Sequence, residues 1–271
     1  MTTRTYTILS GHPKTSRRTI EVHATEEQLE QLAGEGYLVR PSLIPTGLLE
    51  RLRAAADELE AVHLPGAKVR DASFGGLFVR NLIDQNKTFH ELIDFAPLTS
   101  VARAMLGPQI QVHGSVLRVS YPDKPEQAVE WHFHQRVVAD PKPPFFRRPE
   151  AIDNLIYLDE LTPASGPLVV LPKSHLVDKA LPTGDHSDKL GQVIVTCPAG
   201  SVVTASTSLW HRALASTPGA GKRRLVIIGF SPTWMKPVDR PSAGAGSGLT
   251  DVLLPGATEE MRELLGLSGF F

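Results

Sequence analysis

The first third of the chain carries apolar residues at helical spacing. Between residues 46 and 62 they recur every three or four positions, which places them on one face of a helix. Two shorter helices are predicted on either side of it. One begins at the capping box Thr25-Glu26-Glu27-Gln28 and ends near Gly34 and Gly36, and the other covers residues 98–106. The apolar stripe of the long helix consists of Leu48, Leu49, Leu52, Ala55, Ala56 and Leu59.

After Pro108 the pattern changes to short runs rich in β-branched residues, separated by Pro, Gly and Asp. Short strands with turn residues between them predict an antiparallel barrel or sandwich. Because helices come first and strands later, the fold class predicted is α+β, with the helices on one face of a β core. The predicted strands are residues 110–121, 129–138, 154–158, 168–171, 192–196, 201–205 and 225–230.

No internal repeat and no domain-sized linker interrupts this order, so a single domain is predicted over residues 1–271. Two loops rich in Pro, residues 140–148 and 237–248, are each either a lid or an ordinary surface loop. A short terminal helix is predicted over residues 258–265. The expected divisions are an N-terminal arm (1–24), a mainly helical layer (25–107), the β core (108–232) and a C-terminal loop with the short helix (233–271).

Composition narrows the functional classes. The formal net charge is −1, so no strong attraction to nucleic acid or to an anionic membrane is expected. The single cysteine, Cys197, excludes an intramolecular disulfide and cysteine-based zinc sites, and it fits a reducing compartment. No apolar run approaches the roughly 20 residues of a membrane helix, and residues 1–10 lack a signal-peptide core. We therefore expect a cytoplasmic protein, and its oligomeric state stays open.

Three histidines form a candidate site for a divalent metal. His132 and His134 are two residues apart in a predicted strand, so both should point to the same face, with Cα atoms about 6.5–7 Å apart. His211 would complete the site from a later strand, since barrels bring distant strands together. Glu130 lies on the same face, one step back. The alternative is that these are half-buried strand histidines and a loop histidine that bind no metal.

Three segments carry a resemblance to a known family. The first is Trp131-His132-Phe133-His134, where the family usually has Trp-His-Gln-Asp. The second joins Leu158-Asp159-Glu160-Leu161-Thr162-Pro163, Ser165-Gly166-Pro167-Leu168 and Leu171-Pro172-Lys173-Ser174-His175, with Lys173 in place of a glycine. The third joins Pro198-Ala199-Gly200-Ser201-Val202, Leu209-Trp210-His211-Arg212 and Arg223-Arg224. With these segments the chain resembles the phytanoyl-CoA dioxygenase family of Fe(II)/2-oxoglutarate-dependent oxygenases, from the first helix to about Pro232.

The resemblance implies a double-stranded β-helix, a jelly-roll or cupin-like barrel, with an N-terminal helical layer. It implies Fe(II) as cofactor, 2-oxoglutarate as co-substrate, O₂, and a small organic substrate. In this reaction 2-oxoglutarate is decarboxylated and a substrate C–H bond is oxidised. Hydroxylation is the default outcome; desaturation, cyclisation and epimerisation start from the same step. The family's breadth also suggests secondary metabolism.

Residue roles follow from the same resemblance. His132 would be the first iron ligand and His211 the distal one. Arg223 would pair bidentately with the far carboxylate of 2-oxoglutarate, a geometry that suits guanidinium. Its spacing from His211 is one residue longer than usual, which makes Arg224 an alternative, and strand alternation lets only one of the two face inward. Ser120 lies where many relatives have a lysine that contacts the co-substrate, and Arg118, on the same face, could replace it.

The departure at His134 leaves several interpretations. His134 could ligate the metal, so that the site has three histidines and one more unit of positive charge than the family's His-x-Asp pattern. Alternatively, His134 swings away and a carboxylate such as Glu130 or Asp140 completes the site. In a third interpretation the chain is a non-oxidising relative that binds a ligand or assists a partner subunit. A three-histidine metalloenzyme that does not use 2-oxoglutarate is a further alternative, against which Arg223 and Arg224 argue.

Overall fold

The predicted N-terminal helix forms because the residues at both of its ends cap it. In the computed structural model, helix α1 spans Glu26–Glu35. The Thr25 side chain accepts a hydrogen bond from the Gln28 backbone N–H (3.2 Å), and the Gln28 side chain accepts one from the Thr25 N–H (3.1 Å). Gly36 ends the helix in the left-handed region, at φ 85°.

The structure describes residues 3–8, 18–64, 76–122, 128–134, 138–139, 141–148, 150–239, 241–244, 246 and 248–267.

The other predicted helices are also present. Helix α2 spans Thr46–His63, and every residue of its predicted apolar stripe is buried. Helix α3 spans Ala96–Leu106, and the short terminal helix α4 spans Glu259–Leu264. Three 3₁₀ turns, η2 (Leu82–Asp84), η3 (Lys87–Leu92) and η5 (Leu249–Leu253), complete the helical layer. Among the described residues, no helix has the length and apolar character needed to cross a membrane.

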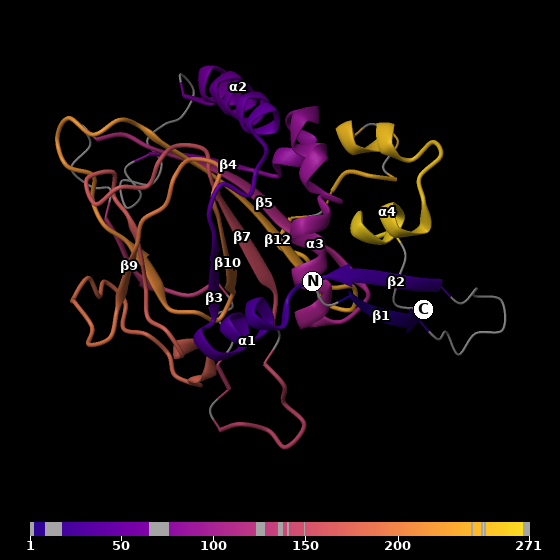
Figure 1. Cartoon of the computed structure of the whole chain (residues 1–271), viewed down its shortest axis with the longest axis horizontal. Coiled ribbons are helices and arrows are strands. Elements are labelled where there is room, and N and C mark those ends of the chain that lie inside the picture. Colours follow the sequence, from indigo (N-terminus) through magenta and orange to yellow (C-terminus); the bar gives the residue numbers. More distant parts are fainter. Residues whose placement is uncertain are drawn as a thin grey trace.

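The strands form two larger antiparallel sheets and one two-stranded sheet (Figure 1). In the six-stranded sheet the order is β3 (Tyr37–Arg40), β10 (Val202–Ser206), β7 (Ile152–Tyr157), β12 (Arg223–Pro232), β5 (Ile110–Ser120) and β4 (Gly76–Arg80). In the four-stranded sheet it is β6 (Val129–His132), β11 (His211–Ala213), β8 (Leu168–Val170) and β9 (Val193–Val195). The arm forms β1 (Thr3–Ile8) and β2 (Arg18–His23).

Two hydrophobic clusters lie on opposite faces of the six-stranded sheet. On β12, Val226 and Ile228 join the larger cluster with the helices, whereas Leu225 joins the smaller cluster with residues of the four-stranded sheet such as Val170. Figure 1 shows the same arrangement, with α3 and α4 on one side of the long strands and β9 on the other. The α+β layering is therefore as predicted, and the inward face of β12 contributes to the space between the two sheets.

One predicted strand ends early, and this changes the geometry expected of the histidines. The run 129–138 was predicted as one strand, but β6 ends at His132. Beyond it, the backbone N–H of His134 donates to the carbonyl of Thr207 (2.8 Å), which follows β10, and so leaves the ladder between β6 and β11. The prediction that His132 and His134 are adjacent on one strand face was therefore wrong. Strands β3 and β4 were not predicted, and β11 was expected only as a later strand carrying His211, without bounds.

The segment Leu171–His175 joins α1 to the strand that carries His211. The Ser174 hydroxyl donates to the Leu171 carbonyl (2.6 Å) and accepts from the Trp210 N–H (2.8 Å). His175 Nε2 bonds the Ala33 carbonyl (2.9 Å). Both side chains satisfy backbone groups, as predicted. Lys173, which stands where the family usually has glycine, adopts φ 68°, a left-handed conformation that is unfavourable for a residue with a Cβ.

Replacement of Lys173 by glycine should therefore stabilise the protein. We expect Lys173→Gly to raise the free energy of unfolding by about 0.5–1 kcal/mol, because relief of the left-handed strain exceeds the added entropy of the unfolded chain. Lys173→Ala is the matched control, since it removes the exposed ion pair with Glu35 but keeps the Cβ. Urea unfolding measures both variants. A Lys173→Gly protein no more stable than Lys173→Ala would contradict the expectation.

Asp84, at the end of η2, holds the C-terminal segment against the helical layer. Its carboxylate accepts hydrogen bonds from the backbone N–H of Ser242 (2.7 Å) and from the N–H and hydroxyl of Thr250 (3.1 and 2.8 Å). Burial raises the pKa of Asp84, but the hydrogen bonds from Ser242 and Thr250 outweigh it, so the net pKa lies below the usual value of 3.8. The folded state therefore favours the ionised form.

Asp84→Asn should destabilise the protein at neutral pH by about 1–3 kcal/mol, because an amide cannot accept all of these bonds. The folded pKa of Asp84 is lower than the unfolded one, so its contribution is present above pH 3.8 and is lost as the pH falls through the lower folded value. The difference between the two proteins in urea unfolding should thus stay constant from pH 7 to about 5 and shrink below about 4. If the difference in the free energy of unfolding instead increased as the pH falls, the ionised Asp84 would not be the group that stabilises the wild-type protein.

Candidate metal centre

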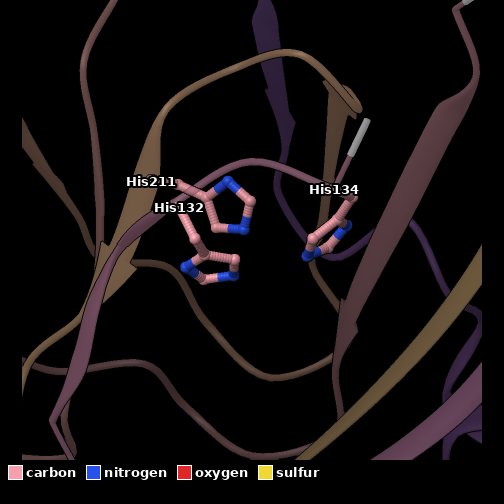
Figure 2. Close-up of side chains that lie close together, drawn as sticks. All are labelled: His132, His134 and His211. Atoms are coloured by element: carbon pink, nitrogen blue, oxygen red, sulfur yellow. The ribbon is translucent and has the colours of Figure 1, made fainter. Parts of the chain in front are cut away.

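Three histidines from different parts of the fold meet between the sheets. His132, the last residue of β6, lies directly opposite His211, the first residue of β11, and their ring centroids are 4.2 Å apart. The ring of His134 is 4.7 Å from that of His211 and 5.4 Å from that of His132. In Figure 2 the rings of His132 and His211 lie together and His134 faces them from the other side. One ligand atom of each residue lies within 4.8 Å of the others, close enough to share one ion.

The second nitrogen of every ring has a hydrogen-bond acceptor. His132 Nδ1 bonds the Glu130 carbonyl (2.9 Å) and His211 Nδ1 bonds the Leu209 carbonyl (2.9 Å). His134 Nδ1 bonds Oδ2 of Asp153 (2.5 Å). Carbonyl and carboxylate oxygens accept, so each Nδ1 carries the proton and each Nε2 keeps its lone pair. Three imidazoles, each with Nδ1 bonded to an oxygen and Nε2 left for a ligand, fit a divalent ion.

The surroundings of the cluster also fix the charges of His211 and Asp153. Burial, with a contribution from the nearby His134, lowers the pKa of His211 to about 3 and keeps it neutral. Burial raises the pKa of Asp153, but the hydrogen bond from His134 and the charge of that ring outweigh it, so the net pKa lies below its usual value. Burial also lowers the pKa of His113, on β5. The site thus combines a neutral imidazole at His211 with an ionised carboxylate behind His134.

Asp153 is the residue that the sequence analysis missed. It lies on β7 at an inward-facing position and is 7% exposed. Its register partner on β12 is Gly229, and a Cβ added there would lie 2.4 Å from Asp153 Oδ1. The absence of a side chain at position 229 therefore makes room for the carboxylate. An acidic residue in the largely apolar run Ile152–Tyr157, whose other polar residue is Asn154, was the available signal, but the predicted strand began at residue 154 and left Asp153 outside it.

Of the two carboxylates considered from the sequence, Glu130 lies in the described part of the chain and is not a member of the histidine cluster. The Glu130 carboxylate accepts a hydrogen bond from the Gly184 N–H, in the loop that follows β8. Asp140 lies outside the described residues. In the described part of the chain, the group able to hold a metal consists of His132, His134 and His211.

A second polar group lies deeper between the sheets. Arg223, the first residue of β12, is 3% exposed, and its Nη2 donates to the Ser120 hydroxyl (3.1 Å). Arg118 is the next inward residue of β5, and burial, with the charge of Arg223, lowers its pKa to about 10. Burial raises the pKa of Tyr157, which faces the same space, although both arginines oppose the shift. The structure thus brings Arg223, Ser120 and Arg118 together.

Arg224 lies on the other face of β12. Its guanidinium pairs with Asp159 (2.6 Å) and with Asp57 of α2 (2.9 Å). By contrast, no carboxylate among the described residues lies within ion-pair distance of Arg223, and its Nε is buried without a hydrogen-bond partner there. The inward arginine is therefore the one that lacks a counter-ion within the described chain.

Comparisons with known proteins agree with this geometry. The sequence profile of the family described as phytanoyl-CoA dioxygenase (PhyH) matches residues 32–224. Similar solved structures include HygX from Streptomyces hygroscopicus with nickel and 2-oxoglutarate bound (17% identity, 84% of this chain, 98% of that chain, TM-score 0.63). They also include the non-heme alpha ketoglutarate dependent carbocyclase SnoK from nogalamycin biosynthesis (16% identity, 78% of this chain, 85% of that chain, TM-score 0.62). A third is EctD from S. alaskensis with 2-oxoglutarate and 5-hydroxyectoine (24% identity, 78% of this chain, 77% of that chain, TM-score 0.61).

These similarities confirm the predicted double-stranded β-helix with its N-terminal helical layer. No curated protein matches the sequence significantly.

Removal of a single histidine should abolish tight metal binding. We expect His132→Ala and His211→Ala each to weaken Co(II) or Ni(II) binding by more than about 100-fold, since loss of an outer partner of a ligand already costs 10–100-fold. His175→Ala is the control, because His175 bonds the Ala33 carbonyl and is not part of the cluster. Competition with a chromophoric chelator gives the affinities. Equal affinity in all of these proteins would show that the ion binds elsewhere.

Proposed function

The chain belongs to the phytanoyl-CoA dioxygenase family, and from that premise we propose that it is an Fe(II)- and 2-oxoglutarate-dependent oxygenase acting on a small organic molecule. The observation that carries the proposal is the pairing of two sites in one barrel. Three histidines suited to an ion lie at one of them, and a buried arginine without a carboxylate partner among the described residues lies at the other. A metal alone would need the first site; a dicarboxylate co-substrate needs both.

His132, His134 and His211 would hold the iron through their Nε2 atoms. When bound, the iron supplies the oxidation chemistry, in which O₂ and 2-oxoglutarate are consumed and a substrate C–H bond is oxidised. The chain's own task is to keep three lone pairs directed at one point. It does so with two backbone carbonyls and one carboxylate, which hold the Nδ1 protons away from the ion.

Arg223 would anchor the far carboxylate of 2-oxoglutarate. A buried guanidinium is unfavourable unless it is paired, and Arg223 has a hydroxyl partner, Ser120, where a carboxylate would be expected. A carboxylate can accept two parallel hydrogen bonds from a guanidinium, which fixes its orientation as well as its position. Arg118 and Tyr157 line the same space, and the positive charge of Arg118 adds to the attraction for an anion.

The competing function is a three-histidine metalloenzyme that does not use 2-oxoglutarate. His134 is the observation that favours it, because a neutral ligand replaces the family's carboxylate. The inward Arg223 favours the oxygenase, since without a dicarboxylate that burial has no evident use. A non-oxidising relative would have no reason to fix all three tautomers for a metal.

The two functions predict different responses to 2-oxoglutarate. In an anaerobic titration with Fe(II) and then 2-oxoglutarate, we expect the weak visible charge-transfer band of the chelate to appear. Arg223→Ala should weaken 2-oxoglutarate binding by about 10–100-fold, the loss expected for charge-assisted hydrogen bonds of about 1.5–3 kcal/mol. Arg224→Ala, which removes the same charge from the outer face, should leave it unchanged. Iron binding without the band in the wild-type protein would support the competing function.

A further inference from the structure

We propose that Asp153 is a positioning residue for the metal site: it holds His134 with Nε2 toward the ion and places a negative charge one imidazole away from it. The inference rests on the proposed function for the presence of the metal. It goes beyond that function in assigning the missing carboxylate of the site to a residue that is not itself a ligand. Asp153 lies on β7 of one sheet, and His134 follows β6 of the other.

His134 needs such a partner more than the other two histidines do. His132 and His211 lie on strands, and each Nδ1 bonds a carbonyl two residues earlier in its own chain segment. His134 lies beyond the end of β6, and its side chain is 34% exposed. A strand ladder does not fix its ring. The bond to Asp153, 19 residues along the sequence, provides the fixed orientation instead.

The surroundings of Asp153 are built for a carboxylate. Asp is rarely buried unless it is paired, and Asp153, which is 7% exposed, has the His134 ring as its partner at 2.5 Å. Gly229, its register partner, provides the space, since any Cβ there would collide with Oδ1. Such a position on a strand that faces the barrel interior would otherwise suit an apolar side chain, as at Leu155 and Tyr157 on the same face.

The charge of the site then matches that of the family pattern. In the resemblance, an aspartate occupies position 134 and brings one negative charge to the metal. Here the ligand is neutral, and the ionised Asp153 behind it restores that charge at a distance of one ring. Hydrogen bonding to a carboxylate also makes an imidazole a stronger donor to a metal. The His134–Asp153 pair therefore acts as one anionic ligand.

The ordinary alternative is an ion pair that joins the two sheets. In that case Asp153 would contribute to the stability of the fold, and the loss of its charge would have no specific effect on the ion. The two interpretations separate when metal affinity and apoprotein stability are measured on the same variants.

The first test is Asp153→Asn, which keeps the size of the side chain and removes its charge. We expect affinity for Co(II), measured by chelator competition, to fall about 10–100-fold while the melting temperature of the apoprotein changes little. Asp239→Asn is the matched control: the side chain of Asp239 is 12% exposed, close to the 11% of Asp153, and it pairs with Arg80 (2.8 Å), not with a histidine of the cluster. It should leave metal affinity unchanged. Should Asp153→Asn fail to fold, Gly229→Ala displaces the carboxylate without changing any charge and should weaken metal binding in the same way.

The second test repeats Asp153→Asn in a His134→Asp background. There a carboxylate ligates directly and Asp153 has no imidazole to orient, so its neutralisation should no longer weaken Co(II) binding and should relieve repulsion between two carboxylates. A loss of the same size in both backgrounds, or none in the wild-type background, overturns the proposal.

The test of 2-oxoglutarate binding is independent of the test of Asp153. If the variants behave as expected but no charge-transfer band forms, the oxygenase function fails and the role of Asp153 stands. A wild-type protein that takes up no divalent ion would overturn both.

Discussion

The pairing of β6 with β11 is the constraint on which the site depends. It places His132 directly across from His211, so that two ligands from segments almost 80 residues apart meet without any loop having to fold over them. Because side chains alternate between faces, a slip of one residue would turn one of the two rings out of the barrel. β11 is also held by β8 on its other edge, and the Ser174–Trp210 hydrogen bond fixes the turn just before it. His132 and His211 are thus held by the sheet itself, whereas His134 depends on its bond to Asp153.

The same alternation explains how one strand serves two purposes. On β12, Val226 and Ile228 pack against the helical layer, while Arg223 and Gly229 face the barrel interior, at opposite ends of that inward row. One end holds the guanidinium and the other makes room for Asp153. Burial of two charged groups in the barrel opposes stability, and the large apolar cluster on the opposite face of the sheet offsets it. Stability and chemistry are therefore assigned to different faces of the same six strands.

Much of this could be predicted from the sequence, for reasons that are local. A capping box and an apolar stripe depend on residues three or four apart, and α1 and α2 begin and end as those patterns require. The bounds of β11 were missed because three residues are too few to show alternation. Whether Arg223 or Arg224 faces inward depends on a register of one residue, which spacing from His211 does not determine. Asp153 was missed because its relation to His134 arises between two sheets and needs a glycine on a third strand.

The space beside Gly229, which the Asp153 carboxylate occupies, also bears on how such a site could arise by mutation. A histidine at position 134 finds a partner for its second nitrogen in this barrel because position 153 is acidic and position 229 has no side chain. A change from aspartate to histidine at position 134 would be harmful in an ancestor that had a side chain at position 229, since the carboxylate would have no room. The absence of a side chain at position 229 must therefore precede the change at position 134, because it gives the supporting carboxylate its place. A larger residue at position 229 of the present chain would displace that carboxylate and so remove the partner of His134.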